Sequence, residues 1–198
     1  MRQSITLAGI ALLAAMSEPG IAVPPPIAQL SANCAEPTYA SDFRVCGDPE
    51  LSALDAIMAR RIAAVGDQAI NPTSVWIESQ ASWFRRRSLC AMQANQGDCL
   101  RAAYGERIAV LDGLSGKRVS MGRAFDCKAN NIIGNARVDL GDDGSAAIYQ
   151  SSVLLAIGQW RFEAKVWKPF VAISSKGRRV TVAAPDASGV ASCVKAAA

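Results

Sequence analysis

The fold of this chain is decided first by residues 46–55, which read CGDPELSALD. Asp48 can accept hydrogen bonds from the free amides of a first helical turn, and Pro49 suits the first position of a helix. Apolar residues then recur at helical spacing, at Leu51, Leu54, Met58, Ile62 and Val65. Gly66 ends the pattern, so the sequence predicts an amphipathic helix over residues 49–65.

Two later segments also place a cysteine at the edge of an amphipathic helix. Residues 80–90 (QASWFRRRSLC) end at Cys90, and residues 99–108 (CLRAAYGERI) begin at Cys99. The expected apolar faces consist of Trp76, Trp83 and Phe84 in the second helix, and of Leu100, Tyr104, Ile108 and Leu111 in the third. We therefore expect a three-helix bundle over residues 34–114, stapled by disulfides at the helix ends.

Beyond an expected linker at residues 115–122, the hydrophobic pattern changes from helical to alternating. Residues 160–166 (WRFEAKV) alternate most regularly and are expected to form a strand. Turn signals occur at residues 142–144, 158–159, 176–177 and 185–189. Their spacing predicts an antiparallel meander of about six to seven strands over residues 123–198, closed as a small barrel or sandwich. The predicted fold class is α+β.

The cysteine content indicates an oxidising compartment, because the six cysteines form an even set. We expect all of them to be bridged: Cys34, Cys46, Cys90, Cys99, Cys127 and Cys193. Cys127 and Cys193 would join the two ends of the β region, while the pairing among the other four stays open. The chain has no histidine and no Cys-x-x-Cys pair, so we expect neither a metal site nor a cofactor.

The N-terminus has the pattern of a secretory signal over residues 1–22. Arg2 precedes an apolar run that is too short for the roughly 20 residues of a membrane-spanning helix. Cleavage is expected after Ala22, which leaves a proline-rich tether at residues 23–33. Asn33 precedes Cys34, where a lipid attachment signal needs a small residue. We expect an exported protein, periplasmic or secreted, with no membrane insertion after signal cleavage.

The order Cys-x-Asp-Pro-Glu-Leu-x-x-Leu-Asp, Trp-x-x-x-Arg-x-x-Cys and Cys-Leu-x-x-x-Tyr-x-x-Arg-Ile runs through residues 46–108. It resembles the N-terminal domain of the LprI-type lysozyme inhibitors, and the resemblance covers residues 34–112. It implies a cysteine-rich helical domain and a lysozyme-type glycosidase as partner. The C-terminal region is faintly similar to the β-barrel inhibitors of chicken-type lysozyme, through Phe125 and the two cysteines Cys127 and Cys193. The two inhibitory loops of those proteins are not intact here, so only their topology is carried over.

Catalysis has few candidate residues. Without histidine, Ser-His-Asp and Cys-His nucleophiles and imidazole acid–base chemistry are excluded. Glycoside hydrolysis needs only two carboxylates. The candidates for them are Glu78, Glu106, Asp139, Asp142, Asp143 and Glu163. No motif places any two together, so we expect no enzymatic activity and keep a glycan hydrolase only as an alternative.

Two groups of side chains have both a functional and a structural interpretation. Trp76, Trp83 and Tyr104 are able to form a sugar-stacking platform, but aromatics on helical apolar faces are usually core, and we expect core. Residues 85–87 (RRR) are able to hold an acidic partner. We expect them instead to be a solvated helix end whose charges complement the helix dipole.

The leading functional hypothesis is an inhibitor that occludes a lysozyme cleft, and the alternative is a cell-envelope adaptor that binds glycan or protein. Such a cleft contains two carboxylates, so a plug should present cations and hydrogen-bond donors. Residues 174–179 (SSKGRR) are expected to form an exposed hairpin, with Ser175, Lys176 and Arg178 as candidate target-binding residues. The net charge of +4 is too small to indicate nucleic acid, and it provides no long-range attraction to a basic lysozyme. Binding would therefore depend on local fit.

Overall fold

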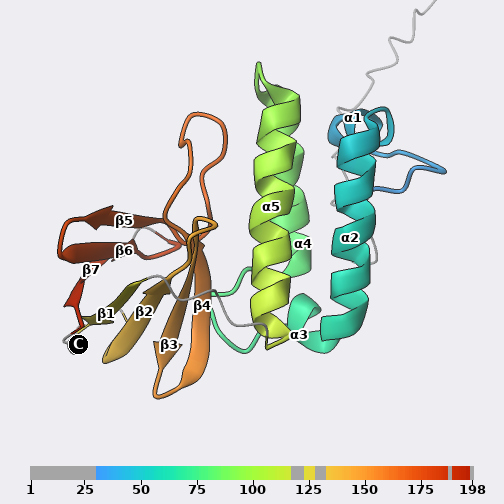
Figure 1. The fold of residues 1–198 in the computed structure, drawn as a ribbon. Helices are drawn as coiled ribbons and strands as arrows, with labels where there is room; N and C mark the ends of the chain where they lie inside the picture. Colours follow the sequence, from blue (N-terminus) through green and yellow to red (C-terminus); the bar gives the residue numbers. More distant parts are fainter. Residues whose placement is uncertain (1–29, 117–122, 128–132, 187–188, 197–198) are drawn as a thin grey trace, which may run out of the picture.

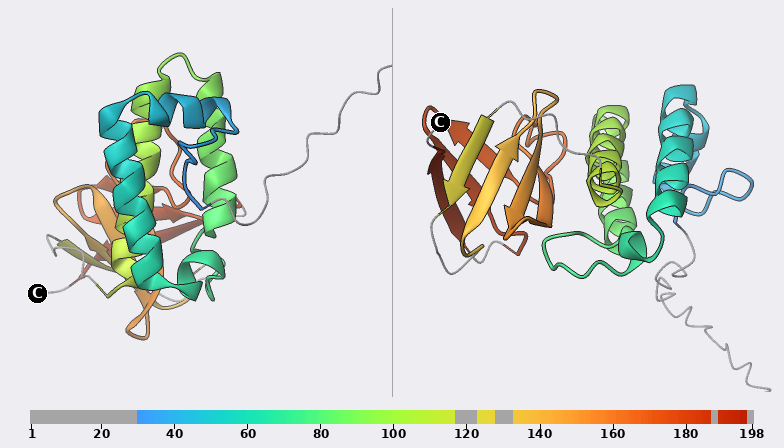
Figure 2. Two further views of the ribbon diagram at one scale, coloured as in Figure 1. Left: turned by 90° about the vertical axis from the view of Figure 1, so that its right-hand side faces the viewer. Right: turned by 60° about the horizontal axis from the view of Figure 1, so that its bottom comes forward.

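Helices and a curled sheet form two layers that pack side by side, as the computed structural model shows for residues 30–116, 123–127, 133–186 and 189–196 (Figures 1 and 2). The fold class is α+β, as predicted. The expected signal over residues 1–22, most of the tether and residues 117–122 of the expected linker lie outside the described residues. Within the described ranges, no helix combines the length and apolar composition that a membrane crossing requires.

The helix predicted from the opening motif forms as α2 (Pro49–Val65). The Asp48 carboxylate accepts hydrogen bonds from the amides of Glu50 and Leu51 at 3.1 and 3.4 Å, which satisfies two of the free donors at the helix start. Gly66 ends the helix with a φ of 69°, which glycine adopts without a side-chain clash. The predicted cap and the predicted end of this helix are both confirmed.

The described residues form five α-helices and one 3-10 helix, so the helical layer is more than a three-helix bundle. Besides α2, these are α1 (Ala40–Cys46), α3 (Asp67–Ile70), α4 (Gln80–Ser88), the 3-10 helix η1 (Leu89–Met92) and α5 (Gln96–Leu114). The predicted aromatics Trp83, Phe84 and Tyr104 lie in the shared core of this layer, each at 1% exposure or less. Packing of apolar side chains therefore holds the helices together.

Both disulfides of the helical layer are local. Cys34 pairs with Cys46 across 12 residues, and Cys90 pairs with Cys99 across 9. The first holds the chain that enters α1 against the end of that helix, and the second closes the turn from η1 into α5. The expectation that disulfides would staple the ends of three helices together is met in part. Cys90–Cys99 joins the end of the second predicted helix to the start of the third, whereas Cys34–Cys46 links the first to no other predicted helix.

A buried chain of polar groups performs that connecting role instead, with one side chain from each of four helices. Arg87 of α4 forms an ion pair with Asp42 of α1 and donates to the Tyr104 hydroxyl of α5 at 2.7 Å. Tyr104 in turn donates to Asp55 of α2 at 2.8 Å. Burial raises the pKa of both Tyr104 and Asp55. Removal of any one member would leave a buried polar group without its partner.

The β region is one antiparallel sheet of seven strands in the described residues, curled into a half-barrel. The strands are β1 (Arg123–Cys127), β2 (Ala136–Leu140), β3 (Ser145–Gln150), β4 (Val153–Gln159), β5 (Ile173–Lys176), β6 (Arg179–Ala183) and β7 (Val190–Lys195). Their spatial order is β4-β3-β2-β1-β7-β6-β5, so two meanders join through the β1–β7 pair. The predicted count of about six to seven strands is confirmed, whereas the sheet is neither a fully paired barrel nor a two-sheet sandwich.

The predicted Cys127–Cys193 disulfide is confirmed, with a Cα–Cα distance of 4.1 Å. Cys127 is the last residue of β1, and Cys193 lies on the adjacent strand β7. The bridge therefore joins the two meanders at the strand pair that connects them. The expected turns at residues 142–144 and 176–177 also form, between β2 and β3 and between β5 and β6.

The strand predicted over residues 160–166 is wrong, and so is the turn predicted at residues 158–159. Gly158 and Gln159 lie inside β4, and the chain then leaves the sheet for a long connection to β5, called here the 160–172 loop. Phe162 is 40% exposed, and Val166 packs against the helical core instead of the sheet. The apolar residues of the alternating pattern therefore share no common face: Trp160 packs against the core of the sheet, Phe162 and Ala164 are exposed, and Val166 packs against the helices.

Two tryptophans, one from each region of the chain, pack in the core of the opposite layer. Trp76 was expected on the apolar face of the second helix, but it precedes α4 and packs in the core of the sheet. Trp167, from the 160–172 loop, packs in the helical core. A third buried cluster, which includes Val110 of α5 and Ile157 of β4, lies between the layers. The helices and the sheet therefore share buried surface.

Candidate functional site

The candidate target-binding residues lie on the β5–β6 hairpin, at the end of the sheet that points away from the helices (Figure 1). Gly177 and Arg178 form its two-residue turn, and Gly177 has a φ of 59°, as a tight hairpin turn requires. Lys176 and Arg178 are exposed, as predicted, and so is Arg179. Among the described residues, none of these three cations has an ion-pair partner. The hairpin tip is therefore a cationic projection.

Ser175 does not join that cluster of cations. Along a strand, successive side chains point to opposite faces. Ser175 pairs with the buried Val180 on the core side of the sheet and is only half-exposed, whereas Lys176 pairs with Arg179 on the outer side. The structure thus brings together Lys176, Arg178 and Arg179, and separates Ser175 from them.

Three of the candidate carboxylates serve local structure in the sheet. Asp143 accepts from the Ser145 amide at 2.9 Å and from its hydroxyl at 2.6 Å, which fixes the β2–β3 turn. Asp139 forms an ion pair with Arg137 at 2.8 Å. Asp142 belongs to the same β2–β3 turn, as predicted. Glu163 lies exposed on the 160–172 loop. Within the described ranges, none of these four carboxylates shares an ion-pair partner with another carboxylate.

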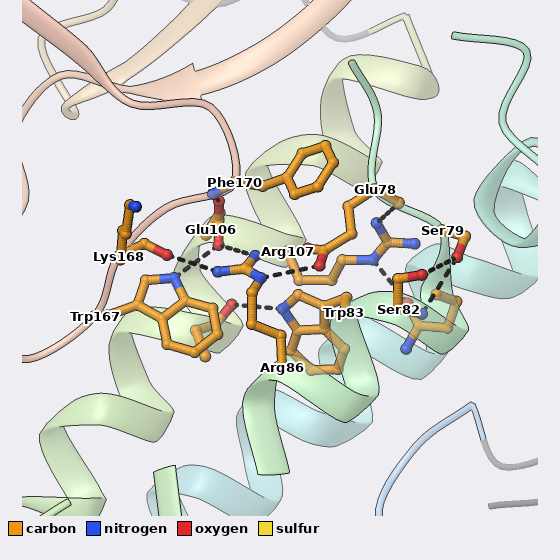
Figure 3. A network of polar contacts seen from close by, with 12 residues as sticks. Glu78, Ser79, Ser82, Trp83, Arg86, Glu106, Arg107, Trp167, Lys168 and Phe170 are labelled. Carbon is orange, nitrogen blue, oxygen red and sulfur yellow. Dashed lines mark hydrogen bonds and ion pairs between the residues drawn. The ribbon is translucent and has the colours of Figure 1, made fainter. Parts of the chain in front are cut away.

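Glu78 and Glu106 are brought together, although no motif predicted it (Figure 3). Arg86 lies between them and donates from Nη2 to both, at 2.6 Å to Glu78 and 2.8 Å to Glu106, while its Nε donates to the other oxygen of Glu78 at 2.9 Å. Both carboxylates are buried, at 7% and 3% exposure. Burial raises the pKa of Glu78, although the ion pair with Arg86 opposes the shift.

The second carboxylate, Glu106, also holds the 160–172 loop. It accepts from the Trp167 indole at 2.7 Å and from the Phe170 amide at 2.6 Å, and Arg86 donates to the Lys168 carbonyl at 2.7 Å. The Arg86 guanidinium lies 4.2 Å from the centre of the Trp167 ring. All four oxygens of Glu78 and Glu106 are engaged, so neither is free to act as a general acid or base in this arrangement. We call this set the Arg86 clamp.

A buried arginine of α5, Arg107, supports the clamp from the helical side. Arg107 donates to Gln80 at 2.7 Å, to the carbonyl of Glu78 at 2.7 Å and to that of Ala69 at 2.9 Å. Burial lowers its pKa to about 10, so it remains a cation at neutral pH. The segment between α3 and α4, which carries Glu78, is therefore fixed at its backbone as well as its side chain.

The prediction that the aromatics Trp76, Trp83 and Tyr104 are core side chains is confirmed, whereas the prediction that residues 85–87 are a solvated helix end is wrong. Trp76, Trp83 and Tyr104 are all buried, so they are core side chains and offer no sugar-stacking surface. Residues 85–87 were expected to be a solvated helix end, but Arg87 is fully buried and Arg86 forms the clamp. Only Arg85 is exposed. The burial of Arg87 and the partial burial of Arg86 are explained by acidic partners outside the run, which the run itself does not reveal.

A groove lies on each side of the 160–172 loop. The sequence predicted neither groove, because its alternating pattern indicated a strand in this region. One groove, of about 440 Å³, separates the loop from α5 and contains four carboxylates: Asp98, Glu106, Asp143 and Glu163. The other, of about 530 Å³, lies between the loop, η1 and the β6–β7 connection and is mainly apolar. No group of three or more potential metal ligands occurs in the described residues.

The chain was also compared with known proteins. It matches no protein-family model, no curated protein and no solved structure at a significant level.

Proposed function

We propose that this protein is an exported binding protein that inhibits a lysozyme-type glycosidase by inserting the β5–β6 hairpin into its cleft. The observation that carries the proposal is the hairpin tip, where Lys176, Arg178 and Arg179 are exposed without ion-pair partners in the described chain. The resemblance of residues 34–112 to the LprI-type inhibitors supports the choice of target. The three disulfides support an oxidising, exported environment.

The geometry of the hairpin supports insertion. Its tip is narrow, because two residues connect the strands, and it points away from the helical layer (Figure 1). The Ser174 and Thr181 hydroxyls are hydrogen-bonded across the hairpin, and the Lys195 amide donates to the Arg178 carbonyl at 2.9 Å. A preorganised element loses less conformational entropy on binding than a mobile loop does. The paired carboxylates of a glycosidase cleft would meet Lys176 and Arg178 there.

We further propose that the protein is not an enzyme. The Arg86 clamp engages every carboxylate oxygen of Glu78 and Glu106, a buried carboxylate pair that shares Arg86 as its ion-pair partner. A retaining or inverting glycosidase needs one carboxyl group that holds a proton and one that is free to attack or to activate water. Neither requirement fits oxygens that already accept hydrogen bonds from Arg86 or from the Phe170 amide.

The test is a titration of the mature protein against several lysozyme types, with lysis of cell-wall suspensions and calorimetric binding as readouts. The variant Lys176→Ala/Arg178→Ala should weaken binding by roughly 2–5 kcal/mol if either cation is desolvated against a carboxylate. The matched control Arg60→Ala/Arg85→Ala removes two exposed cations from the helices and should bind as the parent does. Equal binding by both double variants, or no inhibition of any lysozyme type, would contradict the proposal.

A further inference from the structure

The apolar groove beside the 160–172 loop has the construction of a ligand site. Its walls come from both layers: Leu89 from η1, Phe170 from the loop, and Pro185 and Val190 from the β6–β7 connection and β7. Leu89 is 63% exposed and Val190 is 62% exposed, so large aliphatic side chains face water along the groove. A volume of about 530 Å³ lies within the range of roughly 300–1,000 Å³ found for small-ligand pockets, which often occur at such interfaces.

The charge of this groove has one sign. Its charged lining residues in the described chain are Arg86, Lys165 and Lys168, and none is acidic. The Arg86 charge is already balanced by Glu78 and Glu106 in the clamp. Lys165 and Lys168 are exposed and form no ion pair with any described residue. Their cationic groups are therefore available at the rim of an apolar groove.

The position of the two lysines supports a ligand with two chemically different ends. Both belong to the 160–172 loop, on the same segment as Val166 and Pro169, which line the groove. A hydrocarbon chain would gain free energy from contact with the aliphatic walls in proportion to the area it removes from water. An anionic group at the end of that chain would then meet lysines that lack a partner.

We propose that this groove binds a single-chain amphiphile with an anionic headgroup, such as a long-chain carboxylate. The chain lies against Leu89, Phe170 and Val190, and the headgroup lies at Lys165 and Lys168. One molecule is the occupant, because a groove of about 530 Å³ between the two layers has room for a single chain. The site is independent of the proposed inhibitory hairpin, which extends from the opposite end of β5 and β6 (Figure 1).

The experiment is calorimetric titration of the mature protein with dodecanoate and with dodecylammonium, each below the concentration at which it aggregates. Dodecanoate should bind at one site, and dodecylammonium should bind at least about tenfold more weakly, because its charge is repelled by the lysines. The charge-reversed variant Lys165→Glu/Lys168→Glu should invert that preference. A variant that had lost its fold would bind neither ligand and would also lose its circular dichroism spectrum, so inversion separates the proposal from unfolding.

A matched pair of valines tests the chain-binding wall. Val190→Ser should weaken dodecanoate binding by about tenfold, since it removes apolar contact from the groove. Val153→Ser changes a similarly exposed valine, at 69%, that does not line the groove, and should leave binding unchanged. Equal affinity for the two headgroups, or equal effects of the two serine variants, would overturn the proposal. So would sedimentation with anionic phospholipid vesicles in the absence of dodecanoate binding, because the surface would then bind a bilayer.

Discussion

Replacement of Arg86 by alanine should separate the helical layer from the loop that packs on it. The substitution removes the one cation that Glu78 and Glu106 share and leaves both carboxylates buried, at 7% and 3% exposure. It also removes the hydrogen bond to Lys168 and the contact with the Trp167 ring. We expect Arg86→Ala to cost about 3–5 kcal/mol in the free energy of unfolding, which is typical when one partner of a buried ion pair is deleted.

The assay is urea unfolding followed by tryptophan fluorescence and by far-ultraviolet circular dichroism. Arg85→Ala is the matched control, because it removes the adjacent arginine of the same helix, which is exposed, and should change stability by no more than about 0.5 kcal/mol. The triple variant Arg86→Met/Glu78→Gln/Glu106→Gln should recover much of the loss, because it removes the unpaired charges together with the cation. Equal effects of Arg86→Ala and Arg85→Ala would refute the reasoning.

The pH dependence of the Arg86→Ala effect provides a second check. Burial raises the pKa of Glu78, so the folded state binds more protons than the unfolded state between the ordinary value of 4.5 and the raised one. The free energy of unfolding therefore falls as the pH rises through that window. Loss of Arg86 removes a cation that opposes the shift and widens the window. The variant should therefore be impaired more at neutral pH than at about pH 4, and the opposite trend would show that the carboxylates are not the cause.

Two further outcomes test the architecture. Cys127→Ser/Cys193→Ser opens a loop of 66 residues and should cost about 4 kcal/mol, more than loss of the 9-residue Cys90–Cys99 loop at about 2–3 kcal/mol, as measured by denaturant unfolding. Gly158→Ala places a methyl group 2.8 Å from the Val171 carbonyl oxygen, where β4 meets the end of the 160–172 loop, and should lower the melting temperature; an unchanged value would mean that this contact relaxes freely.

The parts of the fold that were predictable from the sequence are those with local causes. Asp48 and Gly66 delimit α2 through chemistry within one helical turn of each end, and Gly177 forms the tight turn of the hairpin. Cys127 and Cys193 were separated from the other cysteines by a change in periodicity, which correctly assigned them to one sheet. Each of these features depends on residues close in sequence or on a composition boundary.

The parts that were not predictable depend on contacts between distant segments. Arg86 resembles a surface cation in its own helix, and its partial burial is explained by Glu78, by Glu106, twenty residues later, and by the 160–172 loop. The alternating pattern of residues 160–166 has the period of a strand, but hydrogen bonds from Trp167 and Phe170 to Glu106 hold the loop on the helices instead. Both grooves form because the 160–172 loop packs on the helices, so no local sequence pattern predicts them.

The disulfide connectivity matches the order in which the cysteines are synthesised, which bears on how the bridges form. Along the chain, every cysteine is bonded to its immediate neighbour in the cysteine sequence: Cys34 to Cys46, Cys90 to Cys99, and Cys127 to Cys193. A chain that emerges from its N-terminus into an oxidising compartment presents these thiols in that same order. Pairing of each thiol with the next to arrive would generate this native set without any exchange of bridges.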